Sequence, residues 1–270
     1  MSDAPPPTPE DVVAYYETNV EADRLLHGVS ALEFARTKEI VGRFLNAPAT
    51  VADVGGGVGH YSDWLARSGH RVELVEPVPL HLELARERAG DPPRFGVHAA
   101  DARALPFSAE SFDAVLLLGP LYHLGEAGER ARALREARRV CRPGGVVFAA
   151  AISRLAGLLD AVRTGTIADE QVRANVCHEV QTGRRVDASR RMSLFPDAYF
   201  HLPEELEAEV GETGLEVVGV YGVEGPGWLQ KDVDSLPREL LVSLARDVEA
   251  IPHLRALSAH LLAVGTNARS

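Results

Sequence analysis

At residues 51–61 the sequence reads VADVGGGVGHY: a short apolar run that breaks into a glycine-dense turn and continues as the start of a helix. Gly55, Gly57 and Gly59 stand at every second position of the turn, and Asp53 precedes the first of them by two positions. His60 stands where a dinucleotide-binding fingerprint has its third glycine. A strand, a glycine turn and a helix in this order predict a nucleotide-type site in an α/β fold.

The spacing favours S-adenosylmethionine over NAD as the ligand of this turn. A pyrophosphate binds best to the free N–H groups of a helix N-terminus. S-adenosylmethionine has no phosphate but carries an ammonium near a sulfonium, so a carboxylate such as that of Asp53 becomes useful. Glycines lack a Cβ and let a ligand lie against the backbone. Glycine turns also cap ordinary helices, so this motif alone is weak.

Two further acids strengthen the prediction because each ends a later strand-like segment. Glu76 follows the alternating run 71–75, at about the distance at which a ribose-binding acid is expected. Asp101 follows the run 95–100 and could accept a hydrogen bond from an adenine amino group. Either acid alone could equally be a helix cap or a solvated strand end.

Composition limits the classes of partner. The 270 residues carry a formal charge of −11, which argues against electrostatic capture of nucleic acid and favours a neutral or cationic small molecule. Cys141 and Cys177, the only cysteines, show neither a disulfide framework nor metal-ligand spacing, so we expect no metal. We find neither a signal peptide nor an apolar run of membrane-spanning length, and expect a cytoplasmic monomer or homodimer.

The periodicities divide the chain into five parts. Strands near 50, 72, 95, 113 and 145 alternate with helices, which predicts a parallel sheet covered on both faces, and further strands are expected at 215–221 and 260–264. The expected parts are a disordered leader at 1–9, an N-terminal helical cap at 10–47, a core at 48–152, a lid or substrate insertion at 153–202 and the C-terminal part of the core at 203–270.

Four motifs resemble those of class I S-adenosylmethionine-dependent methyltransferases, most strongly over residues 45–152. They are the glycine turn at 53–59, Glu76, Asp101-Ala102 with the following 105–107, and the segment Arg142-Pro143-Gly144-Gly145 before strand five. The resemblance implies a doubly wound, mostly parallel seven-stranded sheet with an antiparallel strand seven between strands five and six. The cap and insertion are also loosely similar to a tRNA carboxymethoxyuridine methyltransferase.

The resemblance also implies which residues hold the cofactor. Gly55, Gly57 and Gly59 would pack on it and Asp53 would assist its methionine end. Glu76 would hold the ribose. The remaining predicted contacts are Asp101 and the Ala102 backbone at the adenine, and Leu118 and Gly119 at the methionine moiety.

Substrate and catalytic residues are less well determined by the sequence. His123 could act as a base beside Tyr122, although both could simply pack the loop after strand four. Tyr199 and His201 in the insertion could contact a substrate or fill the core of the lid. In the cap, Tyr16 and Arg36 could close over the cofactor, with Arg36 on its carboxylate, or could be ordinary helix surface.

These observations predict a methyltransferase acting on oxygen or nitrogen of a small molecule by in-line displacement. Three alternatives stay open. The cofactor could be the sole substrate, cyclised or eliminated to methylthioadenosine. The acceptor could be tRNA, or the chain could be a nicotinamide oxidoreductase, which the glycine spacing disfavours.

Overall fold

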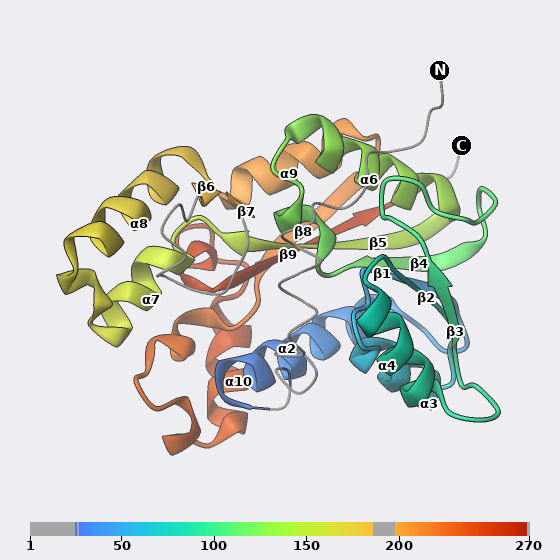
Figure 1. Ribbon diagram of the computed structural model, residues 1–270, viewed down its shortest axis with the longest axis horizontal. Helices are drawn as coiled ribbons and strands as arrows, with labels where there is room; N and C mark the ends of the chain where they lie inside the picture. Colours follow the sequence, from blue (N-terminus) through green and yellow to red (C-terminus); the bar gives the residue numbers. More distant parts are fainter. Residues whose placement is uncertain (1–24, 26, 186–197, 269–270) are drawn as a thin grey trace.

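A single twisted sheet organises the molecule, which we describe from a computed structural model over residues 25, 27–185 and 198–268 (Figure 1). The strand order is β3-β2-β1-β4-β5-β7-β6, and β9 pairs with both β5 and β8. The strands are β1 (Thr50–Val54), β2 (Arg71–Glu76), β3 (Gly96–Ala99), β4 (Phe112–Leu117), β5 (Cys141–Ser153), β6 (Arg184–Arg185), β7 (Ala198–His201), β8 (Glu216–Gly222) and β9 (His260–Thr266).

The direction of the strands confirms the predicted topology. Strands β1 to β5 pair in parallel, whereas β9 runs antiparallel to both β5 and β8 and therefore lies between them. The predicted strands six and seven are β8 and β9. The expected count of seven strands is too low, because the insertion adds β6 and β7. Strand β7 pairs in parallel with β5 at Ile152 and Ser153.

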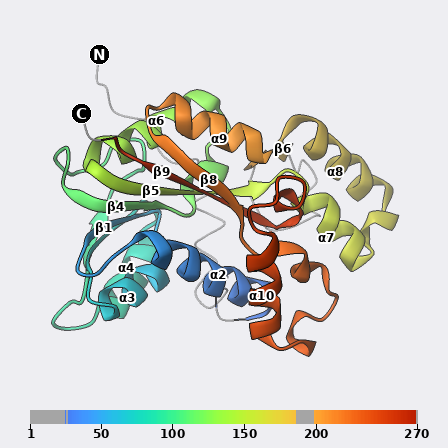
Figure 2. The same cartoon turned by 180° about the vertical axis from the view of Figure 1, so that it is seen from behind.

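Helices cover both faces of the sheet. In Figure 1, α6 and α9 lie on one face, and α2, α3 and α4 lie on the other; the view from behind in Figure 2 agrees. Their bounds are α2 (Gly28–Phe44), α3 (His60–Arg67), α4 (Pro79–Ala89), α5 (Pro120–His123), α6 (Ala127–Val140), α7 (Ala156–Thr164), α8 (Glu170–Thr182), α9 (Pro203–Glu212) and α10 (Arg238–Val248).

Two apolar cores result, one on each face of the sheet. Leu134 of α6 and Leu206 of α9 belong to one core, and Ile40 of α2 and Leu65 of α3 belong to the other. Strand β4 is buried on both faces, which explains its nearly unbroken apolar sequence. The sheet is thus held between two layers, and its carboxyl edge is where loops can form a site.

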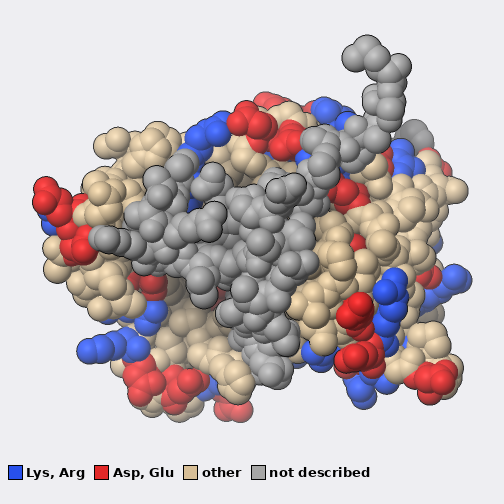
Figure 3. All heavy atoms as spheres, viewed as in Figure 1, with Lys and Arg blue, Asp and Glu red and all other residues tan. Residues whose placement is uncertain are grey.

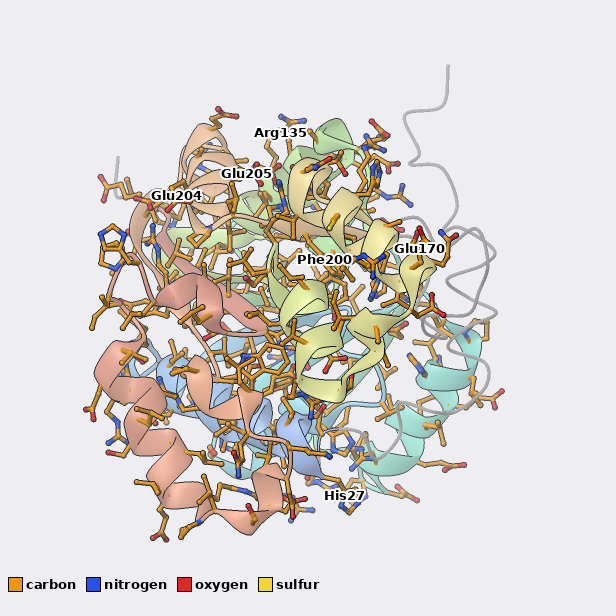
Figure 4. All side chains as sticks on the ribbon, turned by 90° about the vertical axis from the view of Figure 1, so that its left-hand side faces the viewer. His27, Arg135, Glu170, Phe200, Glu204 and Glu205 are labelled. Carbon is orange, nitrogen blue, oxygen red and sulfur yellow. The ribbon has the colours of Figure 1, made fainter. Side chains whose placement is uncertain are left out.

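The predicted insertion at 153–202 contains α7, a 3₁₀ turn at Thr166–Ala168, α8 and the short hairpin of β6 and β7. Asp169 caps α8, because its side chain accepts hydrogen bonds from the backbone N–H groups of Gln171 and Val172. Figure 4 views this end of the molecule, with Phe200 in its interior and Glu170 at the start of α8.

A second insertion, which the sequence does not predict, joins β8 to β9. It comprises α10 and three 3₁₀ turns at Gly225–Leu229, Val233–Ser235 and Arg255–Leu257. It packs on α2, with Leu32 of α2 in contact with Val233 and Leu241. Among the described residues, no helix is both long and apolar enough to cross a membrane.

Candidate active site

A cavity of about 160 Å³ opens at the carboxyl ends of the strands. Its wall comes from the loops after β1, β2, β3 and β4 and from α2, so residues distant in sequence meet there. The lining includes ten predicted site residues: Asp53, Gly55, Gly57, Glu76, Asp101, Ala102, Leu118, Gly119, Tyr122 and His123.

The glycine turn forms the floor of the cavity. Gly55 has a φ of +69°, and a Cβ there would meet Cγ of Pro120 at 2.7 Å, so the close approach of two loops requires glycine. Gly57 has a φ of +55°, and the nearest atom to its virtual Cβ is Nδ1 of His81 at 3.9 Å. Gly57 therefore leaves open space on the cavity side of the turn.

Gly59 has a different role from the predicted one. It is absent from the cavity wall and precedes the first residue of α3 in the left-handed conformation, with a φ of +85°. A Cβ there would meet the ring of Phe95 at 3.0 Å. Gly59 thus permits close packing of the helix on the sheet and does not contact the cavity.

Asp53 is a buried carboxylate at the end of β1, with only 1% of its surface exposed. Its Oδ2 accepts a hydrogen bond from Oγ of Ser62 at 2.7 Å, whereas its Oδ1 has no hydrogen-bond partner among the described residues. Burial raises the pKa of this carboxyl to about 6, and the nearby Glu76 adds to the rise, while the Ser62 hydrogen bond opposes it. A cation reaching this wall would relieve the cost of holding the charge.

Glu76 rigidifies the turn that it faces. One carboxylate oxygen accepts from the N–H of Gly57 and the other from the N–H of Val78, both at 3.0 Å. Each carboxylate oxygen has two lone-pair sites, so Glu76 can still accept hydrogen bonds from hydroxyl groups in the cavity.

Asp101 lines the cavity but is also held by a neighbouring cation. Arg103 donates from Nε and one terminal nitrogen to the two carboxylate oxygens, each at 2.8 Å. Glu129 in turn accepts from Arg103 at 2.6 Å. This bidentate pair fixes the orientation of the Asp101 side chain at the end of β3.

Tyr122 and His123 close the cavity near β4. They lie on the single turn of α5, and their ring centroids are 4.6 Å apart. Burial lowers the pKa of His123 to about 3, so the imidazole is neutral at pH 7 and is a weak base. A packing or hydrogen-bonding role for His123 therefore fits its environment better than proton abstraction.

Arg36, predicted at the cofactor carboxylate, lies elsewhere. Its side chain is fully buried, donates from Nε to the backbone oxygen of Val223 at 3.2 Å, and pairs with Glu39 and Glu249. It joins α2 to the second insertion and does not line the cavity. Tyr16 lies outside the described residues.

The two lid residues predicted at the substrate are also absent from the cavity wall. The Tyr199 ring packs on the guanidinium of Arg130, 3.8 Å from its centroid. His201 is fully buried and 3.3 Å from Glu209. Both residues belong to an internal polar cluster between the lid and α9. Their position therefore agrees with a packing role, which was the alternative to substrate contact.

The structure adds four polar side chains that the sequence does not single out as ligands: Glu33, His60, Tyr61 and His81. His60 and Tyr61 directly follow the glycine turn, so their position was a usable signal. Glu33 carried no such signal, because its place depends on how α2 packs. No lysine or arginine occurs among the described lining residues.

Comparison with known proteins agrees with this geometry. Residues 52–149 match the methyltransferase domain family model. Methyltransferase GfsG from Streptomyces halstedii is 36% identical over 127 residues, which cover 46% of this chain and 44% of GfsG. Demethylmenaquinone methyltransferase from Thermobifida fusca is 28% identical over 82% of this chain and 87% of its own length. The chain matches less than half of the length of GfsG.

A solved structure shares the fold over nearly the whole chain. The 1,6-didemethyltoxoflavin-N1-methyltransferase of Burkholderia thailandensis, with bound 1,6-didemethyltoxoflavin and S-adenosylhomocysteine, superposes with a TM-score of 0.56 at 17% identity. The alignment covers 99% of this chain and 94% of that one. Residues 52–149 thus form a methyltransferase domain, and the chain as a whole has the fold of S-adenosylmethionine-dependent methyltransferases.

Proposed function

We propose that this protein transfers the methyl group of S-adenosylmethionine to nitrogen or oxygen of a small molecule. The observation that carries the proposal is the cavity at the carboxyl edge, whose wall includes an open glycine turn and Asp53, a buried acid with one carboxylate oxygen that has no hydrogen-bond partner among the described residues. When bound, the cofactor supplies a methyl group on a sulfonium. The site residues must orient the donor and acceptor and exclude water, which can provide much of the rate enhancement.

The lining residues fit the cofactor part by part. The free Oδ1 of Asp53 suits an ammonium, and Glu76 can accept from ribose hydroxyls while it holds the turn. Asp101, fixed by Arg103, would face the adenine at the end of β3. Leu118 and Gly119 would border the methionine arm after β4. These assignments leave the side of the cavity toward α2 for the acceptor.

A nucleic-acid acceptor is disfavoured by charge. On the described part of the face in Figure 3, acidic and basic side chains are interspersed and form no continuous basic surface. The chain also carries a net charge of −11, which opposes binding to a phosphate backbone. A small acceptor agrees better with an enclosed cavity.

The test separates methyl transfer from other uses of the cofactor. Purified protein is incubated with S-adenosylmethionine alone, beside a heat-inactivated control, and the nucleosides are identified by mass spectrometry. Methyl transfer requires an acceptor, so the proposal predicts bound, intact cofactor and no methylthioadenosine above the control. Enzyme-dependent methylthioadenosine would contradict it and favour the sole-substrate reaction.

A further inference from the structure

The cavity holds one carboxylate more than the proposed cofactor contacts require. Asp53, Glu76 and Asp101 lie at the ends of β1, β2 and β3, where the cofactor parts are assigned. Glu33 also lines the cavity but comes from α2. Because no lysine or arginine lies among the described lining residues, this fourth carboxylate adds negative charge to an already acidic cavity.

Two residues lie beside Glu33, the buried Glu224 and the partly buried His260. His260 opens β9, and its Nδ1 lies 3.9 Å from a carboxylate oxygen of Glu33. The same Nδ1 is 2.6 Å from Oε1 of Glu224, and the backbone N–H of His260 donates to Oε2 of Glu224 at 2.9 Å. Glu224 has no exposed surface. The imidazole is thus held between a buried carboxylate and one at the cavity wall.

These three residues lie over the other half of the sheet from the cofactor contacts. Glu224 follows β8, and His260 pairs with Ile152 of β5. Strands β1, β2 and β3, which end at the cofactor contacts, lie on the far side of β4. Glu33 therefore faces the part of the cavity that the proposed function leaves for the acceptor.

We propose that Glu33 binds the reacting nitrogen of an amine acceptor. The inference rests on the proposed methyl transfer and narrows its substrate class. The neutral amine donates an N–H hydrogen bond to Glu33 while its lone pair attacks the methyl group. An N–C bond forms, the S–C bond breaks, its electron pair stays on sulfur, and the surplus proton on nitrogen passes to the Glu33 carboxylate.

The surrounding walls suit such an acceptor. Tyr61 and Tyr122 line the cavity and are both buried, so they offer aromatic surface to an apolar body and tolerate a cation. An anionic acceptor would meet Glu33 without a compensating lysine or arginine in the described wall. An alcohol could donate a hydrogen bond to the Glu33 carboxylate, but it has no positive charge and would lack the ion-pair attraction that a protonated amine gains before it gives up its proton and reacts.

A divalent cation is the competing occupant of this cluster. Glu33, Glu224 and His260 can place one ligand atom each within 4.8 Å of one another. However, Nδ1 of His260 already hydrogen-bonds to Oε1 of Glu224, and Oε2 of Glu224 accepts from the backbone N–H of His260, so a metal would have to compete with those bonds. The observed contacts favour a positioning role of His260 and Glu224 behind Glu33.

The test measures binding to the full chain loaded with S-adenosylhomocysteine. Two isosteric pairs serve as probes: benzylamine with benzyl alcohol, and phenethylamine with 2-phenylethanol. Their affinities are compared by ligand-detected NMR for the unmodified protein, for Glu33→Gln, and for Glu83→Gln, a control that makes the same change at an exposed site on α4. Manganese chloride is titrated separately, and S-adenosylhomocysteine affinity is measured for all three proteins.

We expect each amine, which is protonated in solution at pH 7, to bind the unmodified protein about 10-fold or more tightly than its alcohol, because only the amine forms an ion pair with the Glu33 carboxylate. Glu33→Gln should remove this preference without changing S-adenosylhomocysteine affinity, and Glu83→Gln should keep it. Equal affinity for amines and alcohols, or no binding of either, would overturn the inference, as would manganese binding that Glu33→Gln abolishes. Failure of the unmodified protein to bind S-adenosylhomocysteine would instead refute the proposed function itself.

Discussion

Replacing the buried acid at the end of β1 should make the protein more stable, and more so at high pH. Burial raises the pKa of Asp53 from 3.8 to about 6. The folded state therefore holds the proton more tightly than the unfolded state, and stability falls as pH rises between these two values. Above about pH 6 the full free-energy cost of the buried charge is present. A shift of about two pH units, at about 1.4 kcal/mol per unit, makes that cost about 3 kcal/mol.

Asp53→Asn removes the free-energy cost of the buried charge but buries an amide N–H₂ group in its place. The amide can keep the hydrogen bond to Ser62, but its N–H₂ group would lie where Oδ1 has no partner, which costs roughly 1 kcal/mol or more. This second cost does not depend on pH. The penalty on the carboxylate is about half as large at pH 5 as at pH 8, so the gain should grow by about 1 kcal/mol between the two pH values.

The assay is urea unfolding at pH 5 and pH 8, followed by tryptophan fluorescence. Asp113→Asn on the neighbouring β4 is the matched control, because there the hydrogen bonds from Thr50 and the charge of Arg142 outweigh burial and lower the pKa. That variant should lose stability by nearly the same amount at both pH values, because pH 5 and pH 8 both lie above the pKa of Asp113 in the folded and in the unfolded state. If Asp53→Asn changes the unfolding free energy equally at both pH values, the carboxylate is not held at a raised pKa and the reasoning fails.

Three further predictions test the cavity and the residues that support it. Glu76→Gln should weaken S-adenosylhomocysteine binding about 10-fold or more, because it removes a charged acceptor; unchanged affinity in calorimetry would exclude Glu76 from the site. Gly57→Ala should cost about 1–2 kcal/mol in backbone strain yet still fold, with reduced cofactor affinity, whereas Gly55→Ala should lower the melting temperature more because of its clash with the facing loop. Arg36→Met should lower stability by about 1–3 kcal/mol, because the buried Glu249 keeps only Arg43 as a partner and the backbone oxygen of Val223 loses its donor, while the exposed Arg246→Ala should have little effect. Equal melting temperatures of the two arginine variants would show that the buried network adds nothing.

The sheet could be predicted because its signal is local. Each strand from β1 to β4 is a short apolar or alternating run followed by a turn, and Asp53, Glu76 and Asp101 mark three of the strand ends. Parallel strands bring those ends to one edge, so the sequence alone was sufficient to gather the acids around one cavity.

Arg36, Glu33 and Gly59 show where local reasoning stops. The carboxylate of Glu249 that holds Arg36 is 213 residues away in the chain, and no periodicity in the helix reveals such a partner. Glu33, three residues before Arg36, reaches the cavity for the same reason of tertiary packing. Gly59 fits the motif by spacing, yet its conformation is required by the contact between Phe95 and the helix start.

The second insertion escaped prediction for a related reason. Its 3₁₀ turns have no long apolar repeat. The helix α10 is amphipathic, with Leu241 and Ala245 buried four residues apart, but its 11 residues do not reveal that the partner is α2.

Calorimetric titration of the full chain with S-adenosylhomocysteine, with NADH as the comparison ligand, tests the central claim most directly. The account predicts one saturable site for S-adenosylhomocysteine, weakened by Glu76→Gln, and no binding of NADH. Binding of NADH alone, or of neither ligand, would contradict the assignment of this cavity to S-adenosylmethionine.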